Sequence, residues 1–273
     1  MPEIQIEGFT LTALMITAAL CIVAVLAAFY TMRGRIQLSQ IILGVFCYLM
    51  VRMLESIFDL AASMAGLPAA GLVYGLYMIF SVVIAREVIR YVGLRFGVQS
   101  NFDGTDAVVG FAIGFAGAYV CICAAYYFNC YTTAREFTAS GAEAFWVNVG
   151  AGAEEARELL TMISQQSGWQ FILTGVNRVF YLVREIALTV LLWYAMREDG
   201  KKLYFLLVPL MHLAAMVPDG LFQAGVLENS YVKDVVTCVI SGGIAFLAAR
   251  QYNQREDLVA HFRVEKLRAR RRK

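Results

Sequence analysis

The stretch Trp169–Met196 is long and apolar enough to cross a membrane, yet it carries charged residues near its middle. A spanning helix needs about 20 residues. An arginine that faces lipid at the centre of such a helix costs about 2.5–3.5 kcal/mol on insertion scales. Because residues seven apart share a helix face, Arg178 lies over Glu185, with Asn177 over Arg184 beside them. The sequence therefore predicts a membrane protein with a polar interior.

The composition agrees with a chain that lies mostly in the membrane. Apolar residues make up 60% of the 273 residues and charged residues 16%, whereas soluble domains average about 45–50% and about 25%. A chain of this length and composition has no room for a sizeable soluble domain beside its membrane segments. The six cysteines form no CxxC pair, so a disulfide or a thiolate metal site is not expected.

Hydropathy and turn signals predict an all-α fold, a polytopic bundle of about seven transmembrane helices. The expected spans are Gly8–Met32, Leu38–Met64, Ala69–Arg95, Asp106–Asn129, Trp169–Met196, Leu203–Val226 and Val232–Ala249. The fourth span is rich in Gly and Ala, which lets neighbouring helices approach closely. Residues 131–168 form a long polar connection, in which Ala153–Ser164 is predicted to be an amphipathic helix on the membrane surface.

The distribution of Lys and Arg predicts the N-terminus outside and the C-terminus in the cytoplasm. Basic residues follow the first, fifth and seventh spans, whereas the N-terminus and the long polar connection are acidic. We expect one transmembrane domain, residues 1–254, in the plasma membrane, and a basic cytoplasmic tail, residues 255–273. The tail either contacts anionic headgroups of the lipid bilayer or only sets the topology. Nucleic acid is not an expected partner.

Ionisable residues inside the predicted spans have two interpretations. One is charge pairing within the bundle, since buried charges are tolerated when they are paired. The pairs that this interpretation predicts are Arg52 with Glu55, Arg86 or Arg90 with Glu87, and Arg178 or Arg184 with Glu185. The other interpretation is a polar cavity that binds or moves something, because ionisable residues inside a membrane are candidates for a functional site.

A metal site built from these residues would be poor in ligands. A catalytic zinc typically has three protein ligands and an open position. The chain has two histidines, of which His261 lies in the basic tail, and it has no HExxH motif. A buried site would have to combine His212 with carboxylates such as Glu87 and Glu185. No cofactor is therefore firmly predicted, and zinc is the metal to test.

The order of motifs, from Leu49 to about Gly225, resembles the YhfC-type family of bacterial intramembrane metalloproteases, which is distantly similar to the CAAX-protease-like group. The segments that carry the resemblance are Leu54-Glu55, Tyr74-Gly75-Leu76, Arg86–Tyr91, Asp103–Gly117, Gly175–Phe180, Glu185–Ala195 and Leu210–His212 followed by Pro218. The match of GVNRVF and EIALTVLLWYA to the family's GLERxF and HIALSVLVWYA helix is the most specific. The resemblance implies a membrane-embedded metal site that cleaves peptide bonds.

The departures from the family pattern fall on the expected chemistry. Arg86 replaces the first glutamate of EExxR, and Phe115 and Tyr119 replace the histidine and glutamate of GHGGxE. Asn177 replaces the glutamate beside Arg178, and Glu185 replaces the histidine of the HIALS helix. Met216 stands where an acidic residue is expected after His212. The resemblance leaves Glu87, Arg90 and Glu185 in the catalytic region, and His212, Glu87 and Glu185 as the remaining candidate ligands. Further buried polar candidates are Glu55, Arg52, Arg178 and Asn177.

Three hypotheses follow from this pattern. The first is a degenerate, non-catalytic family member that binds transmembrane segments of other proteins, and it predicts Arg–Glu pairs at the former metal site. The second is an active metallopeptidase with a rewired Glu/His site, and it predicts that Glu87, Glu185 and His212 converge within metal-ligand distance. The third is a small transporter or permease subunit, and it predicts a continuous polar path or an internal repeat.

Overall fold

The computed structural model describes residues 4–67, 71–101, 104–197 and 202–271, and every regular element in these ranges is a helix. Among the described residues, seven helices are long and apolar enough to cross a membrane. They are α1 Gly8–Thr31, α2 Leu38–Met64, α3 Leu72–Val92 extended by the π-helical segment Gly93–Val98, α5 Thr105–Ser140, α8 Gly168–Arg197, α9 Tyr204–Gln223 and α10 Ser230–Arg271. The predicted all-α bundle of seven spans is confirmed.

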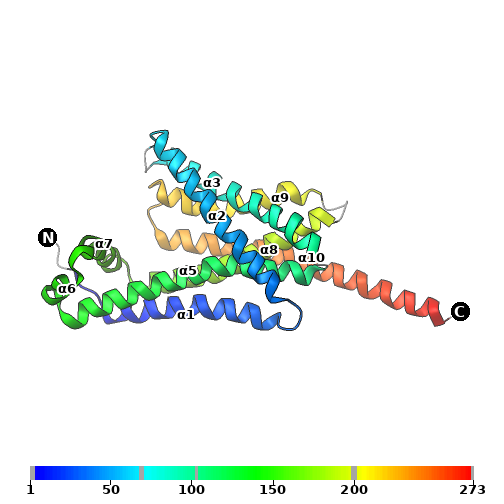
Figure 1. Ribbon diagram of the computed structural model, residues 1–273, viewed down its shortest axis with the longest axis horizontal. Coiled ribbons are helices and arrows are strands. Elements are labelled where there is room, and N and C mark those ends of the chain that lie inside the picture. The colour runs from blue at the N-terminus through cyan, green and yellow to red at the C-terminus, as the bar shows by residue number, and fades with distance from the viewer. Residues whose placement is uncertain (1–3, 68–70, 102–103, 198–201, 272–273) are drawn as a thin grey trace.

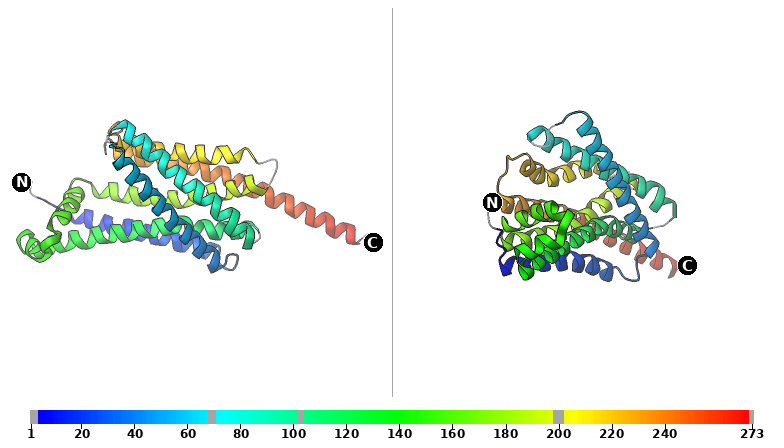
Figure 2. Two further views of the ribbon diagram at one scale, coloured as in Figure 1. Left: turned by 45° about the horizontal axis from the view of Figure 1, so that its top comes forward. Right: turned by 60° about the vertical axis from the view of Figure 1, so that its left-hand side comes forward.

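Helices α5 and α8 form the centre of the bundle. In their most apolar stretches 67% and 72% of the residues are buried, compared with 28% in α1, α2, α9 and α10. Helix α1 packs along both central helices, α10 packs on α8 and α9, and α3 packs on α9 (Figures 1 and 2). The polar face of α8, which the sequence places in a membrane span, is therefore surrounded by protein.

Glycines let the helices cross at close range. A Cβ atom added at Gly44 would lie 2.1 Å from the carbonyl oxygen of Phe111, and one added at Gly114 would lie 2.1 Å from that of Ile41. Only glycine leaves room for this contact between α2 and α5, as expected for a small-residue crossing in a membrane. Beyond the crossing, α2 leaves α5 and runs toward the start of α3 (Figure 1).

The fourth membrane helix is longer than predicted. It continues from Asn129 to Ser140 and is followed by α6 Ala142–Val149, the 3-10 turn Gly150–Gly152 and α7 Ala153–Ser164. The residues after Asn129 are polar but compatible with a helix, so the helix extends beyond its apolar segment. Helix α7 has the predicted bounds, and its buried residues Leu160 and Ile163 join a cluster with residues of α1, α5 and α6.

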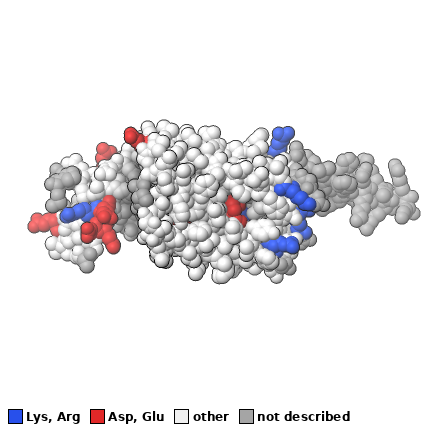
Figure 3. Space-filling view, turned by 90° about the horizontal axis from the view of Figure 1, so that it is seen from above, with Lys and Arg blue, Asp and Glu red and all other residues white. Residues whose placement is uncertain are grey.

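Charged residues gather at the two ends of the molecule. Figure 3 shows mainly acidic residues at the end that holds α6 and α7, and basic residues at the end from which the C-terminal part of α10 extends. This separation of acidic and basic residues is the basis of the predicted membrane orientation. That the basic end faces the cytoplasm stays a prediction. Helix α10 runs unbroken to Arg271, so the boundary expected at residue 254 also stays a prediction, and residues 272–273 of the tail lie outside the described residues.

Candidate functional site

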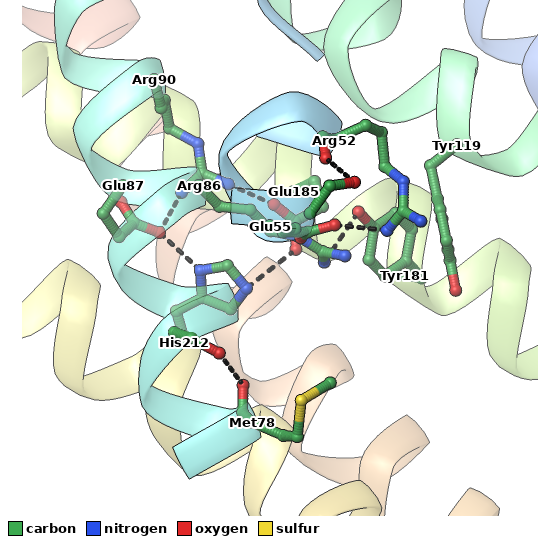
Figure 4. A network of polar contacts seen from close by, with 12 residues as sticks. Arg52, Glu55, Met78, Arg86, Glu87, Arg90, Tyr119, Tyr181, Glu185 and His212 are labelled. Atoms are coloured by element: carbon green, nitrogen blue, oxygen red, sulfur yellow. Dashed lines mark hydrogen bonds and ion pairs between the residues drawn. The ribbon is translucent and has the colours of Figure 1, made fainter. Parts of the chain in front are cut away.

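A network of ionic and aromatic side chains lies at the centre of the bundle (Figure 4). Helices α2, α3, α5, α8 and α9 all contribute to it. Its members are Arg52, Glu55, Arg86, Glu87, Arg90, Tyr119, Arg178, Tyr181, Arg184, Glu185 and His212. Tyr181 joins two parts of the network, because it accepts a hydrogen bond from Arg86 and its ring lies 5.0 Å from the guanidinium carbon of Arg184.

The first part, which we call the balanced half, consists of Glu87, Arg90, Arg184, Glu185 and His212. Arg90 donates hydrogen bonds to both glutamates, Glu87 within its own helix and Glu185 on α8. Arg184 donates to Glu185 Oε1 from Nε at 3.2 Å and from Nη2 at 3.1 Å. Two arginines thus meet two glutamates, and the formal charges cancel. The side chains of Arg90, Glu185 and His212 are fully buried.

His212 bridges the two glutamates of the balanced half. Its Nδ1 lies 2.5 Å from Glu87 Oε1, and its Nε2 lies 3.5 Å from Glu185 Oε1. The carboxylates therefore approach opposite nitrogens of one imidazole ring. A metal ion binds one imidazole nitrogen and needs its other ligands around the same point. Because each glutamate faces a different nitrogen, the three side chains converge without enclosing a common metal position.

The donor set of the balanced half does not fit a zinc centre in this arrangement. Both carboxylates already accept hydrogen bonds from Arg90, which brings a positive charge to the place where a cation would bind. In the part of the chain that the structure describes, no group of three or more His, Cys, Asp or Glu side chains is arranged to hold a metal ion. The metal implied by the resemblance therefore has no matching site here.

The second part, which we call the surplus half, consists of Arg52, Glu55, Arg86 and Arg178 together with Tyr119 and Tyr181. Glu55 accepts hydrogen bonds from Arg52 and, at 3.4 Å, from Arg86 Nε. Arg86 also donates to the Tyr181 hydroxyl at 3.0 Å. The surplus half therefore has a single carboxylate at its centre, shared by two arginines.

Arg178 completes the surplus half through Tyr119. Its Nη1 donates to the Tyr119 hydroxyl at 2.8 Å. The guanidinium carbons of Arg178 and Arg86 lie 5.4 and 5.5 Å from the centre of the Tyr119 ring, within the range of cation–π attraction. Tyr119 is one of the positions where the chain departs from the family pattern, and here its ring and hydroxyl hold two arginines.

Three of the predicted charge pairs are present: Arg52 with Glu55, Arg90 with Glu87, and Arg184 with Glu185. Two side chains take other partners than those predicted. Arg86 pairs with Glu55 across to α2, and Arg178 bonds with Tyr119 across to α5. The spacing along α8 predicted that Arg178 and Glu185 would meet. Instead, Arg178 bonds with Tyr119 on α5 and Glu185 bonds with Arg90 on α3.

A second polar cluster, which the sequence analysis missed, surrounds Asp234 on α10. The buried carboxylate of Asp234 accepts hydrogen bonds from Asn177 at 2.7 Å and from Thr174 at 3.0 Å. Lys233 Nζ lies 3.3 Å from Asp234 and 3.6 Å from Asp219. The stripe of Asp234, Thr237 and Ser241 at i, i+3 and i+7 could have revealed a polar face in the last span.

The fold and this ionic network define a multi-pass integral membrane protein with charged residues at its core. The YhfC intramembrane metalloprotease family model matches residues 16–237, and the chain belongs to this family. It is similar to the "Uncharacterized membrane protein YhfC" of Bacillus subtilis (strain 168), with 23% identity over 177 residues. That alignment covers 62% of this chain and 64% of the relative, which is less than two thirds of the relative's length. No solved structure matches the chain.

Proposed function

We propose that this protein is a non-catalytic member of the YhfC family that binds transmembrane segments of other proteins. The observation that carries the proposal is the position of His212 between Glu87 and Glu185, with Arg90 bonded to both carboxylates. The residues that remain from the expected metal site contact one another and Arg90, and only Glu87 Oε2 and His212 Nε2 among their carboxylate and imidazole atoms are buried without a hydrogen-bond partner in the described residues. In this proposal Glu87, Arg90, Glu185 and His212 hold α3, α8 and α9 together.

A second function, an active metallopeptidase with a rewired site, is favoured by one feature of the same geometry. Glu87, Glu185 and His212 do meet at the centre of the bundle, as this hypothesis predicts. For all three to bind one ion, Arg90 would have to leave the carboxylates and the imidazole ring would have to expose one nitrogen to both of them. The peptidase proposal requires this rearrangement, whereas the binding proposal does not.

The transporter hypothesis also stays a prediction. The ionic network and the Asp234 cluster meet at neighbouring residues of α8, where Asn177 faces Asp234 and Arg178 faces Tyr119. Such proximity is compatible with a polar path across the bundle, but it also suits two separate sets of buried contacts. We favour the binding function because the departures from the family pattern fall at the metal site, and they leave the scaffold unchanged.

Metal content tests the proposal directly. The detergent-purified protein is incubated with zinc, freed of excess metal by gel filtration and measured by elemental analysis, beside His212→Ala and the matched control His261→Ala. We expect less than stoichiometric zinc in all three samples. Stoichiometric zinc that is retained in His261→Ala and lost in His212→Ala would overturn the non-catalytic proposal and revive the rewired peptidase, with Glu87 and Glu185 as co-ligands.

A further inference from the structure

The surplus half of the network lacks negative charge. Three arginines, Arg52, Arg86 and Arg178, share one carboxylate, that of Glu55, which gives a formal charge of +2. In the part of the chain that the structure describes, no other carboxylate forms an ion pair with these arginines.

The neighbouring cluster of Asp219, Asp234 and Lys233 has a formal charge of −1, so this cluster and the surplus half together still have an excess positive charge of +1. Both carboxylates of the balanced half already accept hydrogen bonds from its own arginines. An unmatched positive charge in a low-dielectric interior is costly.

Arg52 shows where the missing anion can approach. It lies in the middle of α2, 14 residues after Leu38 and 12 before Met64. Its side chain is 55% exposed, whereas that of Glu55 is 6% exposed. At about 1.5 Å per residue the nearer helix end is about 18 Å away, which is more than half of a hydrocarbon core about 30 Å thick. Arg52 therefore lies well away from both ends of its predicted membrane span.

The surroundings of Arg52 are apolar and open on the same side. Leu49 and Met53, its neighbours on α2, are 50% and 68% exposed. These residues are suited to contact a hydrophobic helix and not bulk water.

Arg178 has an unused donor in the interior of the surplus half. Its Nε is buried and has no hydrogen-bond partner, while its Nη1 bonds with the Tyr119 hydroxyl. Buried donors of this kind normally have a partner, so an unpaired guanidinium nitrogen in the surplus half agrees with a shortage of acceptor atoms there. A carboxylate is the acceptor that arginine binds with the strongest geometry.

We propose that the surplus half binds an acidic side chain in the middle of a transmembrane segment of a partner protein. The segment lies against the exposed face of α2 that Leu49, Met53, Ile57 and Leu60 form, and its carboxylate is held by Arg52, the exposed arginine of the surplus half. The position of Arg52 near the middle of its span favours a carboxylate within the membrane over a phosphate headgroup at the bilayer surface. This inference rests on the proposed function and specifies the chemistry of the partner.

Synthetic transmembrane peptides test this recognition. A Leu/Ala-rich helix of about 23 residues with one central Glu is compared with peptides that carry Gln or Leu at that position. The full chain is placed in phosphatidylcholine nanodiscs at about pH 8, where a carboxyl is ionised, and binding is followed by energy transfer between labels. We expect the Glu peptide to bind on the order of tenfold more tightly than the Gln peptide.

Two variants assign the effect to the site. In Arg52→Gln we expect the preference for Glu over Gln to fall to within about twofold, because the exposed cation is gone. The matched control Arg95→Gln should keep the full preference, since Arg95 is exposed near the end of its span and bonds with Gln99. Arg52 is half exposed, so this substitution leaves the core packed, and a gel-filtration profile verifies that the variant is folded.

The outcomes separate this inference from the function on which it rests. Equal binding of the Glu and Gln peptides, or a preference that survives in Arg52→Gln, would overturn the acidic recognition and leave partner binding intact. Absence of binding by all three peptides would contradict both. If the Glu peptide does not bind, and native mass spectrometry shows a phosphatidylglycerol molecule retained by the wild type and lost in Arg52→Gln, the site takes a lipid phosphate and the peptide proposal is wrong.

Discussion

The two halves of the buried network use the same types of residue and differ in charge and in exposure. The balanced half pairs two arginines with two glutamates and buries the side chains of Arg90, Glu185 and His212 completely. The surplus half places three arginines around Glu55 and leaves Arg52 55% exposed. Tyr181 connects them, so the difference arises within one continuous structure.

The difference in charge and exposure determines what each half can do. A set of matched charges in a low-dielectric interior fixes three helices against one another, although Glu87 Oε2, Arg90 Nε and His212 Nε2 have no hydrogen-bond partner among the described residues. An open set with excess positive charge is incomplete and attracts an anion. The remaining candidate ligands Glu87, Glu185 and His212 lie in the balanced half, whereas the excess positive charge lies in the surplus half. The following predictions test this contrast.

The largest expected effect is that of Glu185→Ala. This change leaves Arg90 and Arg184 buried without the carboxylate that they share, and breaking a buried pair costs about 3–5 kcal/mol. We expect a large fall in the apparent melting temperature in nanodiscs. Glu55→Ala, in the surplus half, should lower it by less than half as much, because Arg52 is already exposed.

The exposed Glu158 on α7 is the control for both carboxylate removals. Glu158→Ala should leave the melting temperature unchanged, because surface substitutions away from special features have small effects. If Glu55→Ala destabilises the protein as much as Glu185→Ala does, the two halves do not differ as the charges indicate, and the comparison fails.

An intermediate effect is expected from Gly114→Ala. The new Cβ would lie 2.1 Å from the carbonyl oxygen of Ile41, so α2 must shift away from α5. Overpacking of this kind costs about 1–3 kcal/mol. The shift moves α2 relative to Tyr119, so the preference for the Glu peptide should weaken while the balanced half stays paired.

Gly243→Ala is the matched control for the crossing, since a Cβ there meets nothing within 4 Å. In a helix this change should be neutral or stabilising by up to about 1 kcal/mol. Thermal unfolding measures both glycine variants. Equal behaviour of the two would show that the α2–α5 crossing is not as tight as its geometry indicates.

The smallest effect on stability is expected from Arg52→Gln. The substitution lowers the positive charge of the surplus half, and Glu55 keeps its contact with Arg86. We expect a melting temperature within experimental error of the wild type, together with the loss of peptide preference described above. A strong destabilisation would mean that Arg52 has a structural role like that of the arginines in the balanced half.

Much of the fold follows from local features of the sequence. Long apolar segments bounded by Gly, Pro and charged turns define the seven spans, and the amphipathic pattern of Ala153–Ser164 defines α7 with its observed bounds. The length of α5 did not follow, because the polar residues after Asn129 mark the end of an apolar segment and do not mark the end of a helix. Hydropathy indicates which part of a helix lies in the membrane. The end of the helix depends on backbone geometry, such as the positive φ of Gly141.

The sequence alone placed charged residues inside the predicted membrane spans and named every Arg, Glu and His of the network, whereas Tyr181 was not predicted. Pairs within one helix, such as Arg52 with Glu55 and Arg90 with Glu87, follow from helical spacing. The tertiary structure alone decided that Arg86 crosses to Glu55, that Arg178 bonds with Tyr119 and that His212 lies between two carboxylates. These contacts depend on how α2, α3, α5, α8 and α9 cross, and the sequence spacing along any one helix carries no information about the distance between helices.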